Sequence, residues 1–225
     1  MEKAQEEPKQ EKDLLNKKRE RDGNKQKKPK KKIINFITGN ENKYKEISSI
    51  LKEAIPDLEV NQVKADIPEL QGKPEEIVKG KLDFALNTKA KGHPIIVDDT
   101  SLCLNSYKGL PGPYIKSFVE AIGNEGIYKM ACAFEDKTAY AQAILGLQKN
   151  KKDGPHLFIG KVEGEIVSPK GTNNFGNNGW DPVFLPKGES KTYAEMTDTE
   201  KNKISHRSKA LAQLIEYLKA HPEIF

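Results

Sequence analysis

Alternation of short apolar runs with helical patterns constrains the fold of this chain more than any other feature. Residues 33–37 form an apolar β run that ends in a Thr-Gly-Asn turn, and residues 42–54 carry apolar side chains at helical spacing. The same order returns with a strand pattern over 58–65, a helical pattern over 75–88 and a buried strand over 94–97. Strands that alternate with helices predict an α/β fold in which helices flank a sheet.

The second half of the chain has a different pattern. Longer strand patterns cover 138–147 and 157–167, and the Lys-Lys-Asp-Gly sequence at 151–154 between them is typical of a hairpin. The last helix should begin near Asp198, because residues 197–200 have the Thr-x-x-Glu form of a capping box. An antiparallel portion added to the alternating first half predicts a mixed sheet.

Charge divides the chain into a tail and a body. Residues 1–32 hold 13 Lys and Arg against 7 Asp and Glu, whereas the rest holds 25 against 26, so the net charge of +5 comes from the tail. Residues 1–31 have too few apolar side chains to order themselves, and we expect a disordered tail ahead of one domain over 32–225. The basic run at 27–32 has two interpretations. It is either a solubilising segment or a signal for nuclear entry and weak polyanion binding.

Composition also indicates a location. No apolar run approaches the roughly 18 residues of a membrane helix, and the charged N-terminal segment lacks the apolar stretch of a signal peptide. We therefore expect neither membrane insertion nor secretion. Cys103 and Cys132 lie far apart and outside any metal-ligand or redox spacing. That pattern suits a reducing compartment and predicts a cytoplasmic protein.

The turn after the first strand is the first candidate site. A glycine at the carboxyl end of a strand, with a helix N-terminus behind it, presents backbone N–H groups and a positive dipole end to a phosphate. The segment is not a P-loop, because the glycine spacing and the Lys-Ser/Thr pair are missing. The alternative is an ordinary strand-to-helix turn. The turn consists of Thr38, Gly39, Asn40, Glu41, Asn42 and Lys43.

Two adjacent acids follow the buried strand at 94–97. Asp98 and Asp99 should stand where this strand leaves the sheet, at the edge where open α/β sheets bind ligands. Carboxylates there suit Mg²⁺, which commonly uses one or two of them together with substrate phosphates. Glu69 would be another ligand if its loop folds over the same edge. The alternative is a turn in which an Asp side chain caps the next segment.

Three more segments carry polar side chains of interest. Lys116 follows a stiff Gly/Pro loop at the start of a helix, which suits an anion. The loop at 175–181 holds the only tryptophan beside an Asp, which could bind a base or simply anchor the core. Lys201 and His206 lie about 140° apart on an ideal helix, so either the last helix starts irregularly or one of them is structural.

One residue type is informative by its rarity. The body contains a single arginine, Arg207, which either reflects a need for its planar fork at that position or is a chance occurrence. No Ser-His-Asp or Cys-His arrangement suggests itself. Phosphate-binding segments, carboxylates and a base-binding loop together describe metal-assisted attack on a nucleotide phosphate.

In this combination the segments resemble the inosine triphosphate pyrophosphatase family, also called Ham1 or RdgB-like proteins. The resemblance covers about residues 32–219 and leaves the tail out. Its marks in chain order are Thr38-Gly39-Asn40 with Lys43, Asp66-Ile67-Pro68-Glu69, Asp98-Asp99-Thr100, Leu110-Pro111-Gly112-Pro113-Tyr114-Ile115-Lys116, Trp180-Asp181-Pro182, Tyr193-Ala194-Glu195-Met196, and Lys201 with Ser205-His206-Arg207.

The resemblance implies an elongated mixed α/β fold, a homodimer and a nucleoside triphosphate pyrophosphatase. Such an enzyme hydrolyses ITP, dITP and XTP to the monophosphate and pyrophosphate with Mg²⁺, or with Mn²⁺ as a substitute. Glu69 and Asp99 would hold the ion, and Asp99, supported by Asp98, would help to activate water. Residues 38–43 would contact the triphosphate and sugar together with Lys81, Thr100 and Lys116. The base pocket would comprise Phe175, Gly179, Trp180, Asp181, Lys201, His206 and Arg207.

The chain departs from the family pattern at one place. The family reads Phe-Gly-Trp-Asp or Phe-Gly-Tyr-Asp, whereas three further residues separate Phe175-Gly176 from Trp180-Asp181 here. Either Phe175 or Gly176 could keep its family place, and a shifted alignment is the other alternative.

Two alternatives for function remain. One is a pyrophosphatase that prefers another nucleotide, and the other is a polyanion-binding module that acts through its tail.

Overall fold

A mixed β-sheet organises the body of the chain. The structure is a computed structural model that describes residues 31–65, 67–87, 92–172 and 179–225. Among these residues seven strands form one sheet, in the order β2-β1-β3-β5-β6-β7, with β4 paired to β3. The strands are β1 (Lys32–Ile37), β2 (Leu58–Val63), β3 (Ile95–Leu104), β4 (Pro111–Gly112), β5 (Thr138–Gln148), β6 (His156–Ile166) and β7 (Phe184–Pro186).

The two halves of the sheet differ in strand direction. β1 runs parallel to both β2 and β3, whereas β5, β6 and β7 are added antiparallel to β3 and to one another. A hairpin over 149–155 joins β5 to β6, as the Lys-Lys-Asp-Gly sequence predicts. The predicted α/β fold with a mixed sheet is therefore confirmed.

One strand prediction is wrong in length. β3 does not leave the sheet at Asp98 and Asp99 but continues to Leu104, because β5 pairs with it from Ile95 to Leu104. The parallel neighbour β1 pairs with β3 only at Asn35 and Phe36 and ends one residue later at Ile37. The two acids therefore lie inside a long strand, at the point where the parallel part of the sheet stops.

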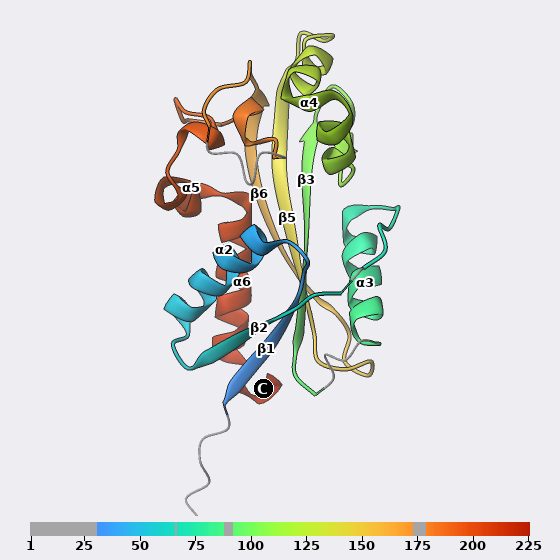
Figure 1. The fold of residues 1–225 in the computed structure, drawn as a ribbon, viewed down its shortest axis with the longest axis vertical. Coiled ribbons are helices and arrows are strands. Elements are labelled where there is room, and N and C mark those ends of the chain that lie inside the picture. The colour runs from blue at the N-terminus through green and yellow to red at the C-terminus, as the bar shows by residue number, and fades with distance from the viewer. Residues whose placement is uncertain (1–30, 66, 88–91, 173–178) are drawn as a thin grey trace, which may run out of the picture. The chain divides into compact units, whose positions relative to one another are not determined.

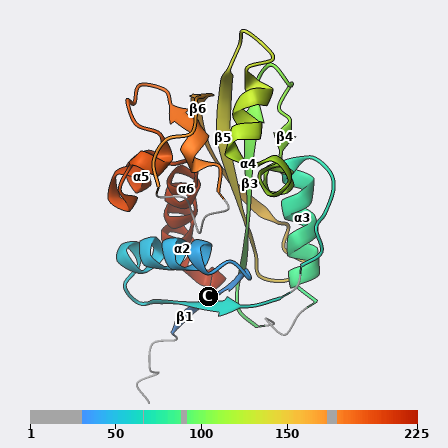
Figure 2. The same cartoon turned by 45° about the horizontal axis from the view of Figure 1, so that its top comes forward.

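Helices cover both faces of the sheet (Figure 1). The helices are α2 (Glu41–Ala54), α3 (Pro74–Ala85), α4 (Ile115–Ala131), α5 (Asp198–Ile204) and α6 (His206–Ala220), with 3-10 turns η1 (Asp181–Val183), η2 (Tyr193–Glu195) and η3 (Pro222–Ile224). α2 and α6 share one face, and Figure 2 shows α3 on the other side of the strands. The predicted helices at 42–54 and 75–88 are thus confirmed as α2 and α3, and the last residues of the second, 88–91, lie outside the described residues.

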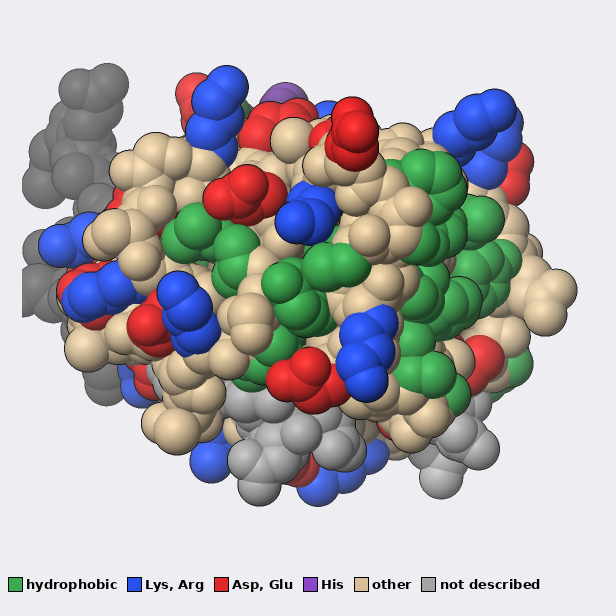
Figure 3. Space-filling model, turned by 90° about the horizontal axis from the view of Figure 1, so that it is seen from above, with side chains coloured by type: hydrophobic (Ala, Val, Ile, Leu, Met, Phe, Trp, Pro, Cys, Tyr) green, Lys and Arg blue, Asp and Glu red, His purple; other side chains and the backbone are tan. Residues whose placement is uncertain are grey.

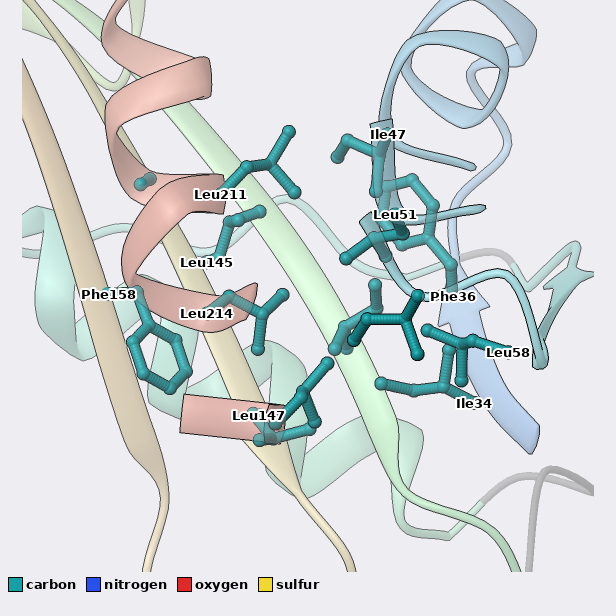
Figure 4. Close-up of a cluster of buried hydrophobic side chains, with 14 of the residues drawn as sticks. Ile34, Phe36, Ile47, Leu51, Leu58, Leu145, Leu147, Phe158, Leu211 and Leu214 are labelled. Carbon is teal, nitrogen blue, oxygen red and sulfur yellow. The ribbon is translucent and has the colours of Figure 1, made fainter. Parts of the chain in front are cut away.

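The main apolar cluster joins α2 and α6 over the sheet. Figure 4 shows Leu211 and Leu214 of α6 and Ile47 and Leu51 of α2 converging over β-strand side chains such as Phe36. These side chains are fully buried. Burial of Leu and Ile side chains contributes about 1.5–3 kcal/mol each, so this cluster fixes where the N-terminus of each helix lies. Both N-termini face the region of Asp98.

Close approach of α6 to β6 requires a glycine. A Cβ atom on Gly160 would lie 1.9 Å from the carbonyl oxygen of His206 and 2.5 Å from the amide nitrogen of Ala210. Any side chain at this position would therefore push away the first turn of α6. The sequence places His206 and Arg207 on this turn, so Gly160 sets their distance from the sheet.

The predicted last helix is two helices. α5 ends and α6 begins at Ser205, whose ψ of 155° is extended. The Ser205 N–H donates to Lys201 in α5, and its Oγ accepts from the Ser208 N–H in α6. The capping box predicted at Thr197 and Glu200 is present at the start of α5. Lys201 and His206 therefore lie on two different helices. Of the two alternatives given by their spacing, the structure shows the one in which the last helix starts irregularly.

The end of the domain near α4 exposes apolar side chains. Figure 3 looks onto this end and shows hydrophobic side chains gathered on one side of it, with charged ones between them. Exposed large apolar residues in the sequence around α4 are Leu110, Ile122 and Phe134. None of the helices in the described ranges is long and apolar enough to cross a membrane.

Candidate active site

A cavity of about 690 Å³ opens where the parallel part of the sheet ends. Its walls come from the β1–α2 turn, α3, β3, the loop before α4, residues 179–181 and the start of α6. Every predicted site residue that the structure describes lines this cavity: Thr38, Gly39, Asn40, Glu41, Asn42, Lys43, Glu69, Lys81, Asp99, Thr100, Lys116, Gly179, Trp180, Asp181, Lys201, His206 and Arg207. Phe175 lies outside the described residues.

The β1–α2 turn is a side-chain-capped helix start. Asn40 is the N-cap of α2, and its Oδ1 accepts from the N–H groups of Asn42 and Lys43 at 3.0 and 3.1 Å. The Asn40 N–H in turn donates to Thr38 Oγ1 at 3.1 Å. Substitution of an N-cap of this kind costs about 0.5–2 kcal/mol. The turn is therefore held in shape before any anion binds, with its dipole end directed at the cavity.

Asp98 is the centre of a buried charge cluster. Its side chain is 1% exposed. Asp98 Oδ2 lies 2.5 Å from Lys43 Nζ, and Asp98 Oδ1 lies 3.6 Å from Arg207 Nε. Burial alone would raise the pKa of the Asp98 carboxyl, but Lys43 and Arg207 outweigh burial and hold that pKa well below its usual value. Asp98 is therefore a fixed negative charge at the floor of the cavity.

Arg207 connects this cluster to α2. Its Nη1 donates to Glu46 Oε2 at 2.8 Å and its Nη2 donates to Thr100 Oγ1 at 3.1 Å. Sequence reasoning did not find Glu46, because it precedes Arg207 by 161 residues in the chain. Glu46 lies about one turn after Lys43 in α2. Burial opposes the charge of Arg207, but Glu46 and Asp98 raise its pKa above the usual value. The guanidinium thus holds Asp98 and Thr100 in place.

Asp99 differs from its neighbour. Its Oδ1 accepts from Lys81 Nζ at 2.6 Å, while its Oδ2 is buried with no hydrogen-bond partner among the described residues. Burial raises the pKa of the Asp99 carboxyl, and the adjacent Asp98 adds to this effect although Lys81 opposes it. The two adjacent carboxyls therefore differ in their affinity for a proton, and Asp99 keeps one oxygen for a further ligand.

Glu69 reaches the same cavity from a loop. Its carboxylate is 85% exposed and accepts from Lys116 Nζ at 3.2 Å. The loop that carries Glu69 is tied to the start of α4, which carries Lys116, by a second contact, in which the Gly72 N–H donates to Oη of the N-cap residue Tyr114 at 3.1 Å. Both predicted metal ligands, Glu69 and Asp99, are thus paired with lysines that were predicted to contact phosphate.

The far end of the cavity is aromatic. The Trp180 ring lies 5.4 Å from His206 and 6.2 Å from Tyr193, measured between ring centroids. Asp181 and Lys201 form an ion pair in which each side chain is 7% exposed. Desolvation first, and then the charge of Asp181, raise the pKa of Tyr193. A flat apolar wall with a buried ion pair beside it is suited to a planar heterocycle with polar edges.

His206 contributes unpartnered polar atoms to this wall. Its side chain is buried, and neither ring nitrogen has a hydrogen-bond partner within the described residues. Burial, followed by the charges of Arg207 and Lys201, lowers the pKa of His206 well below 6.5. The ring is therefore neutral at pH 7 and offers one donor and one acceptor to a ligand.

Comparison with known proteins agrees with this geometry. The Ham1 family model matches residues 34–217. An inosine triphosphate pyrophosphatase from Emericella nidulans is 48% identical over 187 residues, which are 83% of this chain and 97% of that protein. The chain belongs to the Ham1 family.

Solved structures of the family share the fold. A HAM1 protein from Coxiella burnetii superposes with a TM-score of 0.71 at 28% identity, covering 84% of this chain and 98% of that one. A nucleoside-triphosphatase, described as a dITP/XTP pyrophosphatase, from Mycobacterium abscessus superposes with a TM-score of 0.62 at 25% identity, covering 81% of this chain and 98% of that one. The predicted membership of a nucleotide pyrophosphatase family is thus confirmed.

Sequence reasoning missed the apolar and supporting residues of the site. Ile37, Ile67 and Val97 line the cavity but look like ordinary core positions in the sequence. Glu120 also lines it, from the second turn of α4, and it carries no motif. Its position could have been inferred from the sequence, because Glu120 follows Lys116 by four residues and side chains at this spacing share one face of a helix.

The buried His206 should make the stability of this Ham1 protein depend on pH. Below about pH 6.5 the unfolded chain takes up a proton at this ring and the folded protein does not. The free energy of unfolding should therefore fall with decreasing pH, by about 1.4 kcal/mol per pH unit from this group alone. Urea unfolding on both sides of pH 6.5 measures the slope.

A neutral replacement isolates the histidine. His206→Gln should remove this part of the slope, because glutamine does not titrate, whereas His221→Gln at an exposed histidine should keep it. Identical slopes for the parent and His206→Gln would contradict the placement of a neutral His206 in the folded state.

Proposed function

We propose that this protein hydrolyses ITP, dITP and XTP to the nucleoside monophosphate and pyrophosphate in a Mg²⁺-dependent reaction, which removes deaminated purines from the nucleotide pool. The observation that carries the proposal is the pairing of carboxylates with lysines around one cavity. Lys43, Lys81 and Lys116 each bind an acid there. The name of the Emericella nidulans relative supports the same substrate class.

Such pairs suit a ligand that carries both kinds of charge. A triphosphate with a divalent cation presents anionic oxygens for the lysines and a cation for the carboxylates. Exchanging the internal ion pairs for these contacts leaves the buried charge of Asp99 compensated, whereas binding a phosphate alone would leave Asp99 without a cation. The site therefore favours the complex of metal and nucleotide over either part.

Glu69 and Asp99 would hold Mg²⁺, with Mn²⁺ as a substitute. The unpartnered Oδ2 of Asp99 fits this role, because a buried carboxylate oxygen without a donor is suited to a cation. The described residues hold no cluster of three or more His, Cys, Asp or Glu that could bind a metal ion on its own. Two carboxylates suit Mg²⁺, which commonly completes its shell with substrate phosphates and water. When bound, the ion would polarise phosphate oxygens and favour deprotonation of water.

The protein groups would carry out the remaining steps. Asp99 would orient the attacking water and accept its proton, while Lys43 and Arg207 keep Asp98 ionised beside it. The water oxygen forms a bond to the α-phosphorus, and the bond from that phosphorus to the oxygen shared with the β-phosphate breaks. Pyrophosphate leaves, and Lys81 and Lys116 would stabilise its charge.

The aromatic end of the cavity would bind the base. Trp180 offers a face for the purine ring, and Asp181, Lys201 and His206 lie around it. Hypoxanthine and xanthine carry an acceptor oxygen at position 6, where adenine carries an amino donor. Donors from Arg207, His206 or Lys201 would bind that oxygen and would face the adenine amino group donor to donor. Guanine shares the 6-oxygen, and the 2-oxygen of XTP is about as large as the guanine 2-amino group, so we assign rejection of GTP to a 2-amino donor left unpaired near residues 179–181.

Replacement of Arg207 by lysine should narrow the preference for ITP over ATP. Lysine keeps the charge of Arg207 but loses the planar guanidinium. That group bonds Glu46 and Thr100 and would also donate to the oxygen at position 6 of the base. A buried donor left unpaired against adenine costs about 1–3 kcal/mol, so the ratio of kcat/KM for the two nucleotides should fall roughly tenfold. Equal losses for both nucleotides would show that Arg207 supports Asp98 and does not contact the base.

Pyrophosphate release from a panel of triphosphates tests the proposal directly. With Mg²⁺ the purified protein should release pyrophosphate from ITP, dITP and XTP far faster than from ATP or GTP, and chelation by EDTA should stop the reaction. A faster reaction with a standard nucleotide would favour the alternative of a pyrophosphatase with a different base preference. Absence of pyrophosphate from every nucleotide would overturn the proposal.

The proposal also covers the oligomeric state and the cellular location of the protein. The exposed apolar side chains Leu110, Ile122 and Phe134 support a homodimer, which light scattering on the purified protein would test. We place the protein in the cytoplasm, and the basic run at 27–32 leaves nuclear entry as the alternative. A fluorescent fusion with and without residues 1–31 separates these locations. The shortened protein should keep its turnover, because the proposed site lies in the body.

A further inference from the structure

Asn124 lies in α4 outside the wall of the cavity, and the proposed reaction does not use it. The helix is interrupted just before it, because Gly123 has φ 64° and ψ 179°. A positive φ of this size is readily adopted by glycine and not by residues with a Cβ atom. Asn124 is the first residue after this interruption, and its side chain reaches Gly179, the residue directly before Trp180.

A side-chain hydrogen bond connects the two segments. Asn124 Nδ2 donates to the carbonyl oxygen of Gly179 at 3.0 Å. The orientation of the amide follows from chemistry, because only its NH₂ group can face a carbonyl oxygen. The other amide atom, Oδ1, is buried and has no hydrogen-bond partner among the described residues. Within the described residues, the bond to the Gly179 carbonyl is therefore the hydrogen bond that the Asn124 side chain makes.

Trp180 is held firmly on its other side. Asp181 is bound by Lys201 of α5, and the Trp180 ring packs edge-on against Phe184 with 5.7 Å between centroids. These contacts fix the chain after Trp180, whereas the bond from Asn124 fixes the carbonyl directly before it. Gly179, Trp180 and Asp181 all line the cavity. The indole is thus positioned between anchors that come from α4 and from α5.

We propose that Asn124 is a positioning residue that sets the distance between Trp180 and a bound purine, and so contributes to discrimination among purine bases. The inference rests on the proposed function, in which Trp180 forms a face of the base pocket. A Gly179 carbonyl released from α4 would let Gly179 and the backbone of Trp180 move outward, while Asp181 stays bound to Lys201. The added room would let water reach the 2-amino group of guanine, which the parent pocket would leave unpaired, and so would reduce the discrimination against GTP.

Two substitutions of Asn124 provide the test. Asn124→Ala removes the donor, and Asn124→Asp keeps the shape of the side chain but places an oxygen against the Gly179 carbonyl. Glu125→Ala is the matched control, because Glu125 is the exposed next residue of the same helix. Thermal unfolding of all three variants verifies that the fold is kept.

Trp180 is the only tryptophan of the chain, so its fluorescence reports on this position without turnover. The probes are ITP and GTP, added with Mg²⁺ in their α,β-methylene forms so that neither is hydrolysed. In the parent and in Glu125→Ala, ITP should change the Trp180 emission at lower concentration than GTP. In both Asn124 variants the emission without nucleotide should shift to longer wavelength, because Trp180 is more exposed. The dissociation constant of GTP relative to that of ITP should fall by about 3- to 10-fold.

Rates with Mg²⁺ complete the experiment. The kcat for ITP should stay within about threefold of the parent, since the Asp99 end of the cavity is unchanged, while KM for ITP rises. Unchanged emission and an unchanged ratio of dissociation constants in Asn124→Asp would overturn the inference. A parent that releases pyrophosphate from ITP but shows no response of Trp180 to nucleotide would overturn it and leave the proposed function standing. A parent that releases pyrophosphate from no triphosphate would overturn the proposed function and the selectivity role with it.

Discussion

Replacing Asp99 with asparagine should lower kcat for ITP by about 10³-fold or more and leave the fold intact. Asparagine fills the same space, but its amide is a poor ligand for Mg²⁺ and does not accept the proton of an attacking water. It also cannot neutralise Lys81, which binds Asp99 Oδ1 at 2.6 Å. Pyrophosphate release at saturating ITP and Mg²⁺ measures the loss, and the thermal midpoint verifies folding.

An acid on the same side of the sheet provides the control. Asp83 lies in α3 two residues after Lys81 and is exposed. Asp83→Asn makes the same chemical change outside the cavity and should keep the parental rate. If Asp99→Asn kept a rate within a few-fold of the parent, the metal site would have to be placed elsewhere.

Replacing Lys201 with methionine should lower the free energy of unfolding by about 3–5 kcal/mol. The variant leaves the carboxylate of Asp181 buried without its cation, and each side chain of the pair is 7% exposed. For a chain of this length, one kcal/mol corresponds to about 2–4 °C, so the thermal midpoint should fall by roughly 6–20 °C. Thermal unfolding followed by circular dichroism measures the shift.

An exposed ion pair in the same part of the chain gives the contrast. Lys191 and Glu200 lie 3.0 Å apart with side chains 50% and 45% exposed. Lys191→Met should therefore cost less than about 1 kcal/mol, because water already solvates both charges. The double variant Lys201→Met with Asp181→Asn should recover much of the loss, since no unpaired charge stays buried. A midpoint for Lys201→Met equal to that of Lys191→Met would contradict the buried pair.

Local sequence patterns predicted the elements and their ends where one segment decides them. The helical spacing of Ile47 and Leu51 predicted α2, and the Thr-x-x-Glu pattern predicted the start of α5, because capping and amphipathicity involve neighbours within one turn. The extent of β3 could not be predicted in the same way. Its continuation through Asp98 and Asp99 depends on pairing with β5, more than 40 residues later in the chain.

The sequence by itself determined which residues are candidates for the site of this Ham1 protein, because their types and order form short motifs. Tertiary structure decided how those residues are paired. Arg207 bonds Glu46 and approaches Asp98, and Asn124 bonds Gly179, through contacts between segments far apart in the chain. Lys201 and His206 reach one cavity because the backbone is extended at Ser205. Such pairings depend on how α4, α5 and α6 pack on the sheet, and packing is a property of the whole core that no local pattern contains.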